Sequence, residues 1–175
     1  MNIVLIGFMG TGKSTVGRLL ASQLAYEFLD TDLLIEREQG AKIPQIFATH
    51  GEQYFRKIEQ RLAVELGKTD HKVIATGGGM VLNPQNIVNL RQNGFVIALV
   101  ATPEVIYERV KQENHRPLLS GANSCAKIAA LLLERAPYYE NSDLMINTLT
   151  KTAPELVADI IGYLGRRGHY GRSST

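Results

Sequence analysis

Near its start the chain reads Gly7-Phe8-Met9-Gly10-Thr11-Gly12-Lys13-Ser14, which fits the pattern G-x-x-x-x-G-K-[ST] at every fixed position. The apolar run at residues 2–7 is typical of a buried parallel strand, and residues 14–25 follow with helical periodicity. A glycine-rich turn between a strand and a helix lets backbone N–H groups surround phosphate oxygens at the positive end of the helix dipole. We therefore predict a phosphate-binding loop here, in preference to a strand-to-helix turn without a ligand.

The loop assigns a task to each of its polar residues. Lys13 is expected to reach the β- and γ-phosphates of a nucleotide as a point charge, and the Ser14 hydroxyl is expected to ligate the Mg²⁺ that bridges them. The sequence lacks the Asn-Lys-x-Asp run with which a GTPase reads guanine, which argues against a GTPase. The expected ATP-binding residues of the loop are Gly10, Thr11, Gly12, Lys13, Ser14 and Thr15.

The rest of the chain alternates between short apolar runs and helical patterns, which predicts an α/β fold with a parallel sheet covered on both sides. Residues 111–124 are polar and aperiodic, and a loop of that length in a compact domain is usually functional or disordered. Further strands are expected at 26–30, 73–76, 95–101 and 144–147, and further helices at 52–66, 84–92, from 102 onward, 125–135 and 154–164.

The composition fits one globular domain. The chain has 175 residues, 45% of them hydrophobic and 21% charged, and its net charge of +2 is too small to argue for nucleic acid. A single cysteine, Cys125, excludes an internal disulfide and fits a reducing cytosol. The start has no basic leader, and its apolar run is too short to span a membrane. We expect a monomeric cytoplasmic protein with a domain at 1–165 and a basic, flexible tail at 166–175.

Two further features follow predicted strands. Asp30-Thr31-Asp32 would supply the anionic shell that magnesium needs, although Asp30 could equally be a helix N-cap and Asp32 a first-turn acid. Gly77-Gly78-Gly79 favours close approach of a ligand to the backbone over a flexible turn. Arg116, in the aperiodic loop, would stabilise charge on a transferring phosphoryl group, but it could also be a solvated surface arginine.

Together these motifs resemble those of the shikimate kinase family over residues 2–164. The resemblance implies a three-layer phosphate-loop kinase fold with a five-stranded parallel sheet, a substrate-binding region at about 31–60 and a mobile lid at about 111–124. It implies ATP-dependent phosphorylation of shikimate to 3-phosphoshikimate in aromatic amino acid biosynthesis, with Mg²⁺ as cofactor. The lid motif Arg-Pro-Leu-Leu corresponds to residues 116–119, and its arginine meets the phosphates.

The resemblance also implies site roles, residue by residue. Asp30 supports magnesium, and Asp32 holds the substrate hydroxyls. Residues 55–59 match a Phe-Arg-x-x-Glu motif and residues 134–139 a Glu-Arg-x-x-x-Tyr motif; the arginine of each binds the substrate carboxylate. The implied catalytic residues are Lys13, Asp32 and Arg116. The implied substrate-binding residues are Asp32, Phe47, Phe55, Arg56, Glu59, Gly77, Gly78, Gly79 and Arg135.

Some of these assignments leave alternatives open. Phe47 and Phe55 would pack against the substrate ring, although either could belong to the core. Arg109 and Pro154 would enclose adenine, although each has an ordinary structural explanation, a surface helix charge and a first-turn helix proline. Residues 140–143 depart from the family pattern by about one residue. The rival functions are another small-molecule kinase, such as a gluconate or nucleoside monophosphate kinase, and a nucleotide-binding regulator without turnover.

Overall fold

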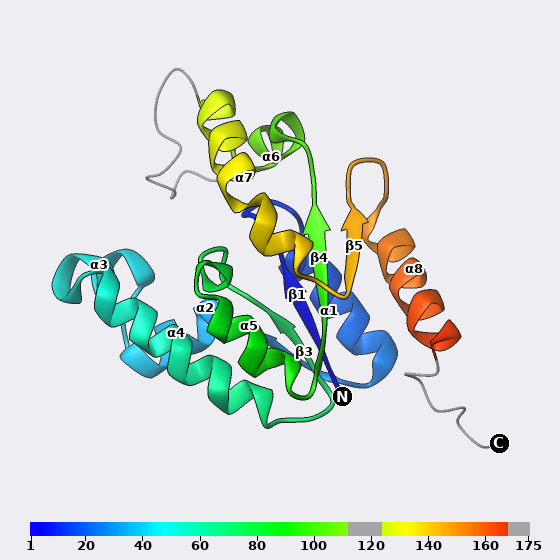
Figure 1. Ribbon diagram of the computed structural model, residues 1–175, viewed down its shortest axis with the longest axis horizontal. Coiled ribbons are helices and arrows are strands. Elements are labelled where there is room, and N and C mark those ends of the chain that lie inside the picture. Colours follow the sequence, from blue (N-terminus) through cyan, green and yellow to red (C-terminus); the bar gives the residue numbers. More distant parts are fainter. Residues whose placement is uncertain (112–123, 168–175) are drawn as a thin grey trace.

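Five parallel strands form one sheet in the order β2-β3-β1-β4-β5 (Figure 1). The computed structural model describes residues 1–111 and 124–167. Strand β1 is central, and its Leu5 pairs with Ala75 on one side and Ile97 on the other. The predicted five-stranded parallel α/β sheet is therefore confirmed. The strands are β1 (Asn2–Ile6), β2 (Glu27–Asp30), β3 (Lys72–Ala75), β4 (Gly94–Val100) and β5 (Leu144–Asn147).

Helices cover both faces of the sheet, because successive side chains of a strand point to opposite faces. Val4 and Ile6 pack into one buried cluster with residues of α4 and α5. Ile3 and Leu5 pack into another with residues of α1 and α8. Figure 1 shows α4 and α5 on one side of the sheet and α8 on the other. The helices are α1 (Lys13–Leu24), α2 (Thr31–Gln39), α3 (Ile43–His50), α4 (Glu52–Gly67), α5 (Pro84–Arg91), α6 (Pro103–Val110), α7 (Ser124–Glu140), α8 (Ala153–Arg166) and the short 3₁₀ helix η1 (Met80–Leu82).

Most predicted elements lie within two residues of the observed ones, but three helices differ. Helices α2 and α3 were not expected, since α2 buries only Thr31 and Ile35 and α3 only Ile46. Helix α7 continues through Pro137 to Glu140, well past its predicted end. Proline usually breaks a helix by removing one hydrogen bond. Here the burial of Tyr139 beyond the proline anchors the last turn of α7 in the core.

Residues 140–143, where the sequence departs from the family pattern, lead from the end of α7 into β5. Asp143 accepts a hydrogen bond from the backbone N–H of Val96 through its side chain (2.8 Å) and donates its own N–H to the Val96 carbonyl (2.8 Å). The Asp143 side chain therefore attaches this connection to β4. Among the described helices, none is both long enough and apolar enough to cross a bilayer.

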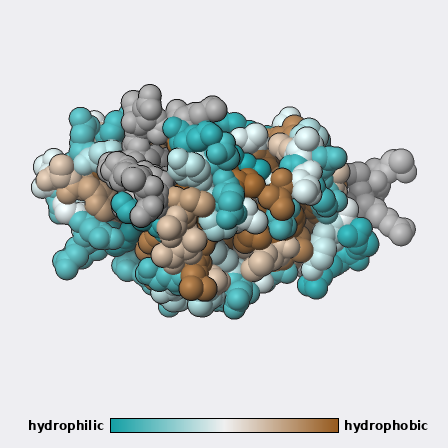
Figure 2. Space-filling model, turned by 90° about the horizontal axis from the view of Figure 1, so that it is seen from above, coloured by the Kyte–Doolittle hydropathy of each residue, from teal (hydrophilic) through white to brown (hydrophobic). Residues whose placement is uncertain are grey.

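The surface seen from above in Figure 2 has hydrophilic side chains around a central group of hydrophobic ones. The carboxyl ends of the strands point toward this side in Figure 1. In open parallel sheets, ligands bind in the crevice outside the carboxyl ends of the strands. A ligand site is therefore expected at this end of the sheet.

We predict that Gly67→Ala destabilises the fold. A Cβ at Gly67 would lie less than 3.0 Å from the carbonyl oxygen of Asn89, which is backbone of α5 and cannot rotate away. Forcing α4 and α5 apart should lower the free energy of unfolding by about 1–3 kcal/mol. Gly165→Ala in α8 is the control, because nothing lies within 4 Å of its Cβ, and it should be neutral or slightly stabilising. Urea unfolding curves that coincide for the two variants would contradict this packing.

Candidate active site

The predicted phosphate-binding loop leaves the carboxyl end of β1 and enters α1. Gly7, Gly10 and Gly12 have φ angles of 146°, 73° and 92°, which residues other than glycine rarely adopt. At Gly7 a side chain would also collide with the carbonyl oxygen of Leu99 on β4. The loop therefore has the tight, glycine-dependent turn that the motif predicts.

Lys13 and Ser14 link the loop to its surroundings. The buried Lys13 donates through Nζ to the carbonyl oxygens of Gly7 (2.8 Å) and Phe8 (2.9 Å). The Ser14 hydroxyl donates to Asp30 Oδ2 (2.8 Å). The Lys13 ammonium group thus lies against the loop that is expected to bind phosphates.

Asp30 uses both of its carboxylate oxygens. Oδ1 accepts from the backbone N–H groups of Asp32 (3.1 Å) and Leu33 (3.4 Å) and caps α2, while Oδ2 accepts from Ser14. The helix-cap explanation for Asp30 is confirmed, and the bond to Ser14 places this carboxylate beside the phosphate loop, while its support of magnesium stays a prediction. A hydroxyl and a carboxylate side by side form an oxygen-only donor pair, which fits Mg²⁺.

These side chains line a cleft of about 470 Å³ beside the loop, which we call the main cleft. Its walls come from the loop, from the start of α2 and from the end of β3. The lining residues that carry predicted roles are Gly10, Gly12, Lys13, Ser14, Thr15, Asp30, Asp32 and Gly78. Arg18 and Thr76, to which no role was assigned, also line it.

Gly77 follows β3 and lies against Asp32. A Cβ at Gly77 would be less than 3.0 Å from Asp32 Oδ1, so only glycine leaves room for this carboxylate. The Gly77 N–H donates to the buried Thr31 hydroxyl (2.8 Å), which ties the start of α2 to the end of β3. Sequence reasoning missed Thr31, since a threonine between two aspartates carries no signal of a partner 46 residues away.

The next two glycines each lie against an arginine, Gly78 against Arg135 of α7 and Gly79 against Arg56 of α4. Arg135 donates from Nη1 to the Gly78 carbonyl oxygen (3.1 Å). A Cβ at Gly79 would be less than 3.0 Å from Arg56 Nη1. The structure places protein side chains close to these glycines, and the expected approach of a ligand to their backbone stays a prediction. The triple glycine is thus a common floor for Asp32, Arg135 and Arg56, although the two arginines do not line the main cleft.

Arg56 has two acidic partners on its own helix. Its Nη1 donates to Glu59 Oε2 (2.6 Å), and its Nη2 donates to Glu52 Oε1 (3.0 Å). Glu59 is almost fully buried, and this burial raises the pKa of its carboxyl, while the neighbouring Arg56 charge lowers it and the Asp32 charge raises it again. Glu59 therefore fixes the direction of the Arg56 guanidinium.

The two predicted ring contacts lie in the core region. The rings of Phe47 and Phe55 pack with centroids 4.8 Å apart. Phe55 is buried, and Phe47 is half-buried against the same cluster. Neither residue lines the main cleft, and their contact with a substrate ring stays a prediction.

A second cleft of about 230 Å³ adjoins the loop on its other side, sharing Gly12 and Thr15 with the main cleft. Thr11 and Arg109 line it. Arg109 donates to the Thr148 hydroxyl (3.1 Å), the Thr148 carbonyl (3.0 Å) and the Gly10 carbonyl (3.2 Å), so its guanidinium is fixed beside the loop.

Two predicted nucleotide contacts, Pro154 and Arg116, are not among the described residues that line either cleft. The exposed Pro154 is on the first turn of α8, and its neighbour Ala153 lines the second cleft instead. Arg116, with nearly all of the predicted lid, lies outside the described residues. Thr148, which fixes Arg109, was missed because its partner is 39 residues away in the sequence.

Comparison with known proteins agrees on one family. A model of the family described as shikimate kinase matches residues 9–164. A shikimate kinase from Caldanaerobacter subterraneus subsp. tengcongensis is 46% identical over 168 residues, which cover 95% of this chain and 98% of the relative.

Solved structures agree with this. A shikimate kinase from Acinetobacter baumannii in complex with shikimate aligns with a TM-score of 0.89 at 40% identity, covering 95% of this chain and 93% of the other. A gluconokinase from Sinorhizobium meliloti aligns with a TM-score of 0.63 at 18% identity over 96% of this chain and 93% of its own, and shares the fold alone.

We predict that Gly77→Ala displaces the Asp32 carboxylate without unfolding the protein, because a side-chain end can move where backbone cannot. Misplacing such a group should lower turnover by about 10²-fold, with little change in melting temperature. Gly78→Ala is the matched control, since its Cβ would meet only the Met9 nitrogen at 3.7 Å. Crystal structures and turnover of both variants test this. An unmoved Asp32 in Gly77→Ala would contradict the proposed packing.

We also predict that Glu59 titrates above the ordinary range of a glutamate, and that Arg56→Ala raises its pKa further by removing the opposing charge. A raised pKa in the folded state means that Glu59 binds its proton more tightly there than in the unfolded chain. Its contribution to stability is then full below the unfolded pKa and is lost as pH rises through the folded one. Carboxyl-detected NMR titration measures the midpoint, and an ordinary midpoint in the unmutated protein would refute the assignment.

Proposed function

The chain belongs to the shikimate kinase family, and we propose that it transfers the γ-phosphoryl group of ATP to shikimate, giving ADP and 3-phosphoshikimate. One observation carries the proposal beyond family membership. Asp32, Arg135 and Arg56 come from three different helices and converge on Gly77, Gly78 and Gly79 beside the phosphate loop.

On the substrate side, the two arginines suit a carboxylate. A guanidinium is planar, keeps its charge and donates parallel hydrogen bonds, so two of them can bind a single carboxylate from different directions. We assign this role to Arg56 and Arg135. Glu59 would hold Arg56 in place, and Phe47 and Phe55 would contact the ring from the core side.

On the nucleotide side, Lys13 and the N–H groups of residues 10–15 would bind the phosphates, and Arg109 and Pro154 would enclose the adenine. ATP would lie across the two clefts, which meet at Gly12 and Thr15. Ser14 and Asp30 would hold Mg²⁺, which when bound neutralises charge on the phosphates. Arg116 would add a further positive charge at the transferring group.

Asp32 would orient the attacking hydroxyl of shikimate. The new bond forms between this oxygen and the γ-phosphorus as the bond from that phosphorus to the β–γ bridging oxygen breaks, and ADP leaves. The hydroxyl proton passes to Asp32 or, through it, to solvent. Since the transition state of phosphoryl transfer is loose, positioning and charge neutralisation carry most of the catalysis. The lid at 111–124 would close over both ligands and exclude water that would otherwise hydrolyse ATP.

The organisation of the protein is part of the proposal. We infer a monomeric cytoplasmic enzyme of one domain, residues 1–165, with a basic tail, and without nucleic-acid or membrane partners. A net charge of +2 and a single cysteine support this. The product would enter aromatic amino acid biosynthesis.

An acceptor panel in an ADP-release assay tests the function, with shikimate, its methyl ester, gluconate and a nucleoside monophosphate. We expect turnover with shikimate and at least about a hundredfold lower kcat/KM with the uncharged ester, since Arg56 and Arg135 would lose an anionic partner. Arg56→Ala should lower kcat/KM for shikimate much more than for the ester. Arg61→Ala is the control, because this exposed arginine on the same helix pairs with Glu38 instead.

The outcomes of this assay separate the rival functions. Preference for gluconate or a nucleotide acceptor would favour another small-molecule kinase of this fold. ATP binding with no acceptor-dependent ADP release would favour a regulator without turnover.

A further inference from the structure

Helix α7 carries two buried polar atoms whose hydrogen-bonding capacity is not used. Within the described part of the chain, neither Arg135 Nε nor the Tyr139 hydroxyl has a hydrogen-bond partner. The two residues are four positions apart on one helix, so their side chains lie on the same face. Buried polar groups are almost always paired, and an unpaired one costs stability. A pair of unused groups this close together points to a shared task.

Arg135 is otherwise closely held. Its guanidinium lies 5.3 Å from the ring centroid of Phe8, over the aromatic face, and Nη1 donates to the Gly78 carbonyl. These contacts fix one face and one end of the guanidinium. They leave the Nε edge, which is buried, without a partner.

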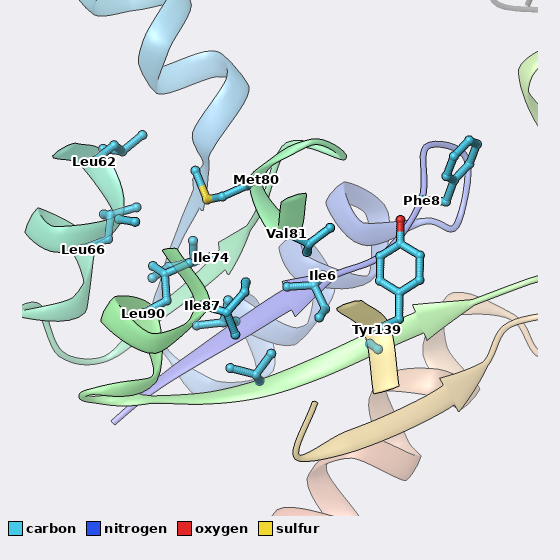
Figure 3. Packing of buried hydrophobic residues seen from close by; sticks show 14 of the residues in the cluster. Ile6, Phe8, Leu62, Leu66, Ile74, Met80, Val81, Ile87, Leu90 and Tyr139 are labelled. Atoms are coloured by element: carbon cyan, nitrogen blue, oxygen red, sulfur yellow. The ribbon is translucent and has the colours of Figure 1, made fainter. Parts of the chain in front are cut away.

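Tyr139 lies where it can serve that edge. Only 3% of it is exposed, and Figure 3 shows its hydroxyl pointing toward the side on which Phe8 lies. Burial has the largest effect on this hydroxyl and raises the pKa of the phenol, against the opposing effects of the Arg135 charge and of its nearby N–H group, so the phenol stays neutral near pH 7. A neutral phenol can accept a hydrogen bond from a guanidinium N–H while donating its own proton elsewhere.

We propose that Tyr139 is a positioning residue for Arg135. When the terminal nitrogens of Arg135 bind the substrate carboxylate, the phenolic oxygen of Tyr139 accepts from Nε and keeps those nitrogens turned toward the carboxylate; this hydrogen bond is not formed in the structure described. The proposal rests on the proposed function, because it assumes that Arg135 binds this carboxylate. A guanidinium held at Nε presents its two terminal nitrogens as a fork, the geometry that matches a carboxylate. Tyr139 does not touch the substrate in this account.

The simpler role of Tyr139 is packing, since its ring belongs to the buried cluster between the sheet and α7. Tyr139→Phe separates the two roles, because it keeps the ring and removes only the hydroxyl. A packing role predicts no kinetic change. The positioning role predicts a higher KM for shikimate of about tenfold, the effect of losing one hydrogen bond to a charged group. It also predicts that kcat and the KM for ATP stay within about twofold.

Steady-state kinetics on four variants test this: Tyr139→Phe, Arg135→Ala, the double variant, and Tyr138→Phe as a control on the neighbouring, half-buried ring. We expect the hydroxyl deletion to raise the KM for shikimate in the wild-type background and to have no further effect in the Arg135→Ala background. Thermal melting should show that Tyr139→Phe stays folded, because the variant keeps the ring that packs in the buried cluster.

Three results would overturn the proposal. An unchanged KM for shikimate in Tyr139→Phe would leave Tyr139 with packing alone. An equal effect of Tyr139→Phe with and without Arg135 would show that it does not act through Arg135. An equal rise in Tyr138→Phe would indicate a general disturbance of α7. Wild-type protein that releases no ADP with shikimate would remove the proposed function along with this inference, whereas an active wild type beside an unaltered Tyr139→Phe removes the inference alone.

Discussion

The parallel pairing of β1 with β3 and β4 is the constraint on which the site depends. Because Leu5 pairs with both Ala75 and Ile97, the three central strands end at one edge of the sheet. The phosphate loop and the triple glycine leave that edge side by side, and α1 begins there with its positive dipole end. The buried apolar faces of β1 fix this register, since a slip by one residue would turn Ile3 and Leu5 to the wrong face.

Charge at this edge is already partly satisfied by the protein. Lys13 donates to the carbonyls of Gly7 and Phe8, and Arg135 donates to the carbonyl of Gly78. Main-chain carbonyls are neutral acceptors, whereas a phosphate or carboxylate adds the Coulomb attraction of a full negative charge to the hydrogen bond. An anionic ligand can therefore replace these acceptors at a gain. Arg56 differs, because the buried Glu59 carboxylate holds it and leaves it less free to turn. The site thus combines an arginine held by a buried carboxylate with an arginine that donates to a main-chain carbonyl.

The sequence predicted the sheet and the phosphate loop because both rest on local signals, a continuous apolar run and a motif of fixed spacing. It missed α2 and α3, whose few buried residues give no clear period. It also ended α7 at Arg135, whereas tertiary packing carries the helix through Pro137 to Glu140. The predicted site residues around the triple glycine do come together, but the reason for the glycines does not follow from the sequence. Asp32 and Arg56 fill the space in front of them through contacts that cross the chain.

The central claim is that one pocket holds a small hydroxy acid between paired arginines and an aspartate, opposite a phosphate cradle. A crystal structure of this protein with shikimate, ADP and Mg²⁺ tests it most directly. The account predicts the shikimate carboxylate in hydrogen-bond contact with both Arg56 and Arg135, one ring hydroxyl against Asp32, and the ADP phosphates on the loop around Lys13. A carboxylate that contacts neither arginine, with Asp32 turned away from the ring, would contradict it.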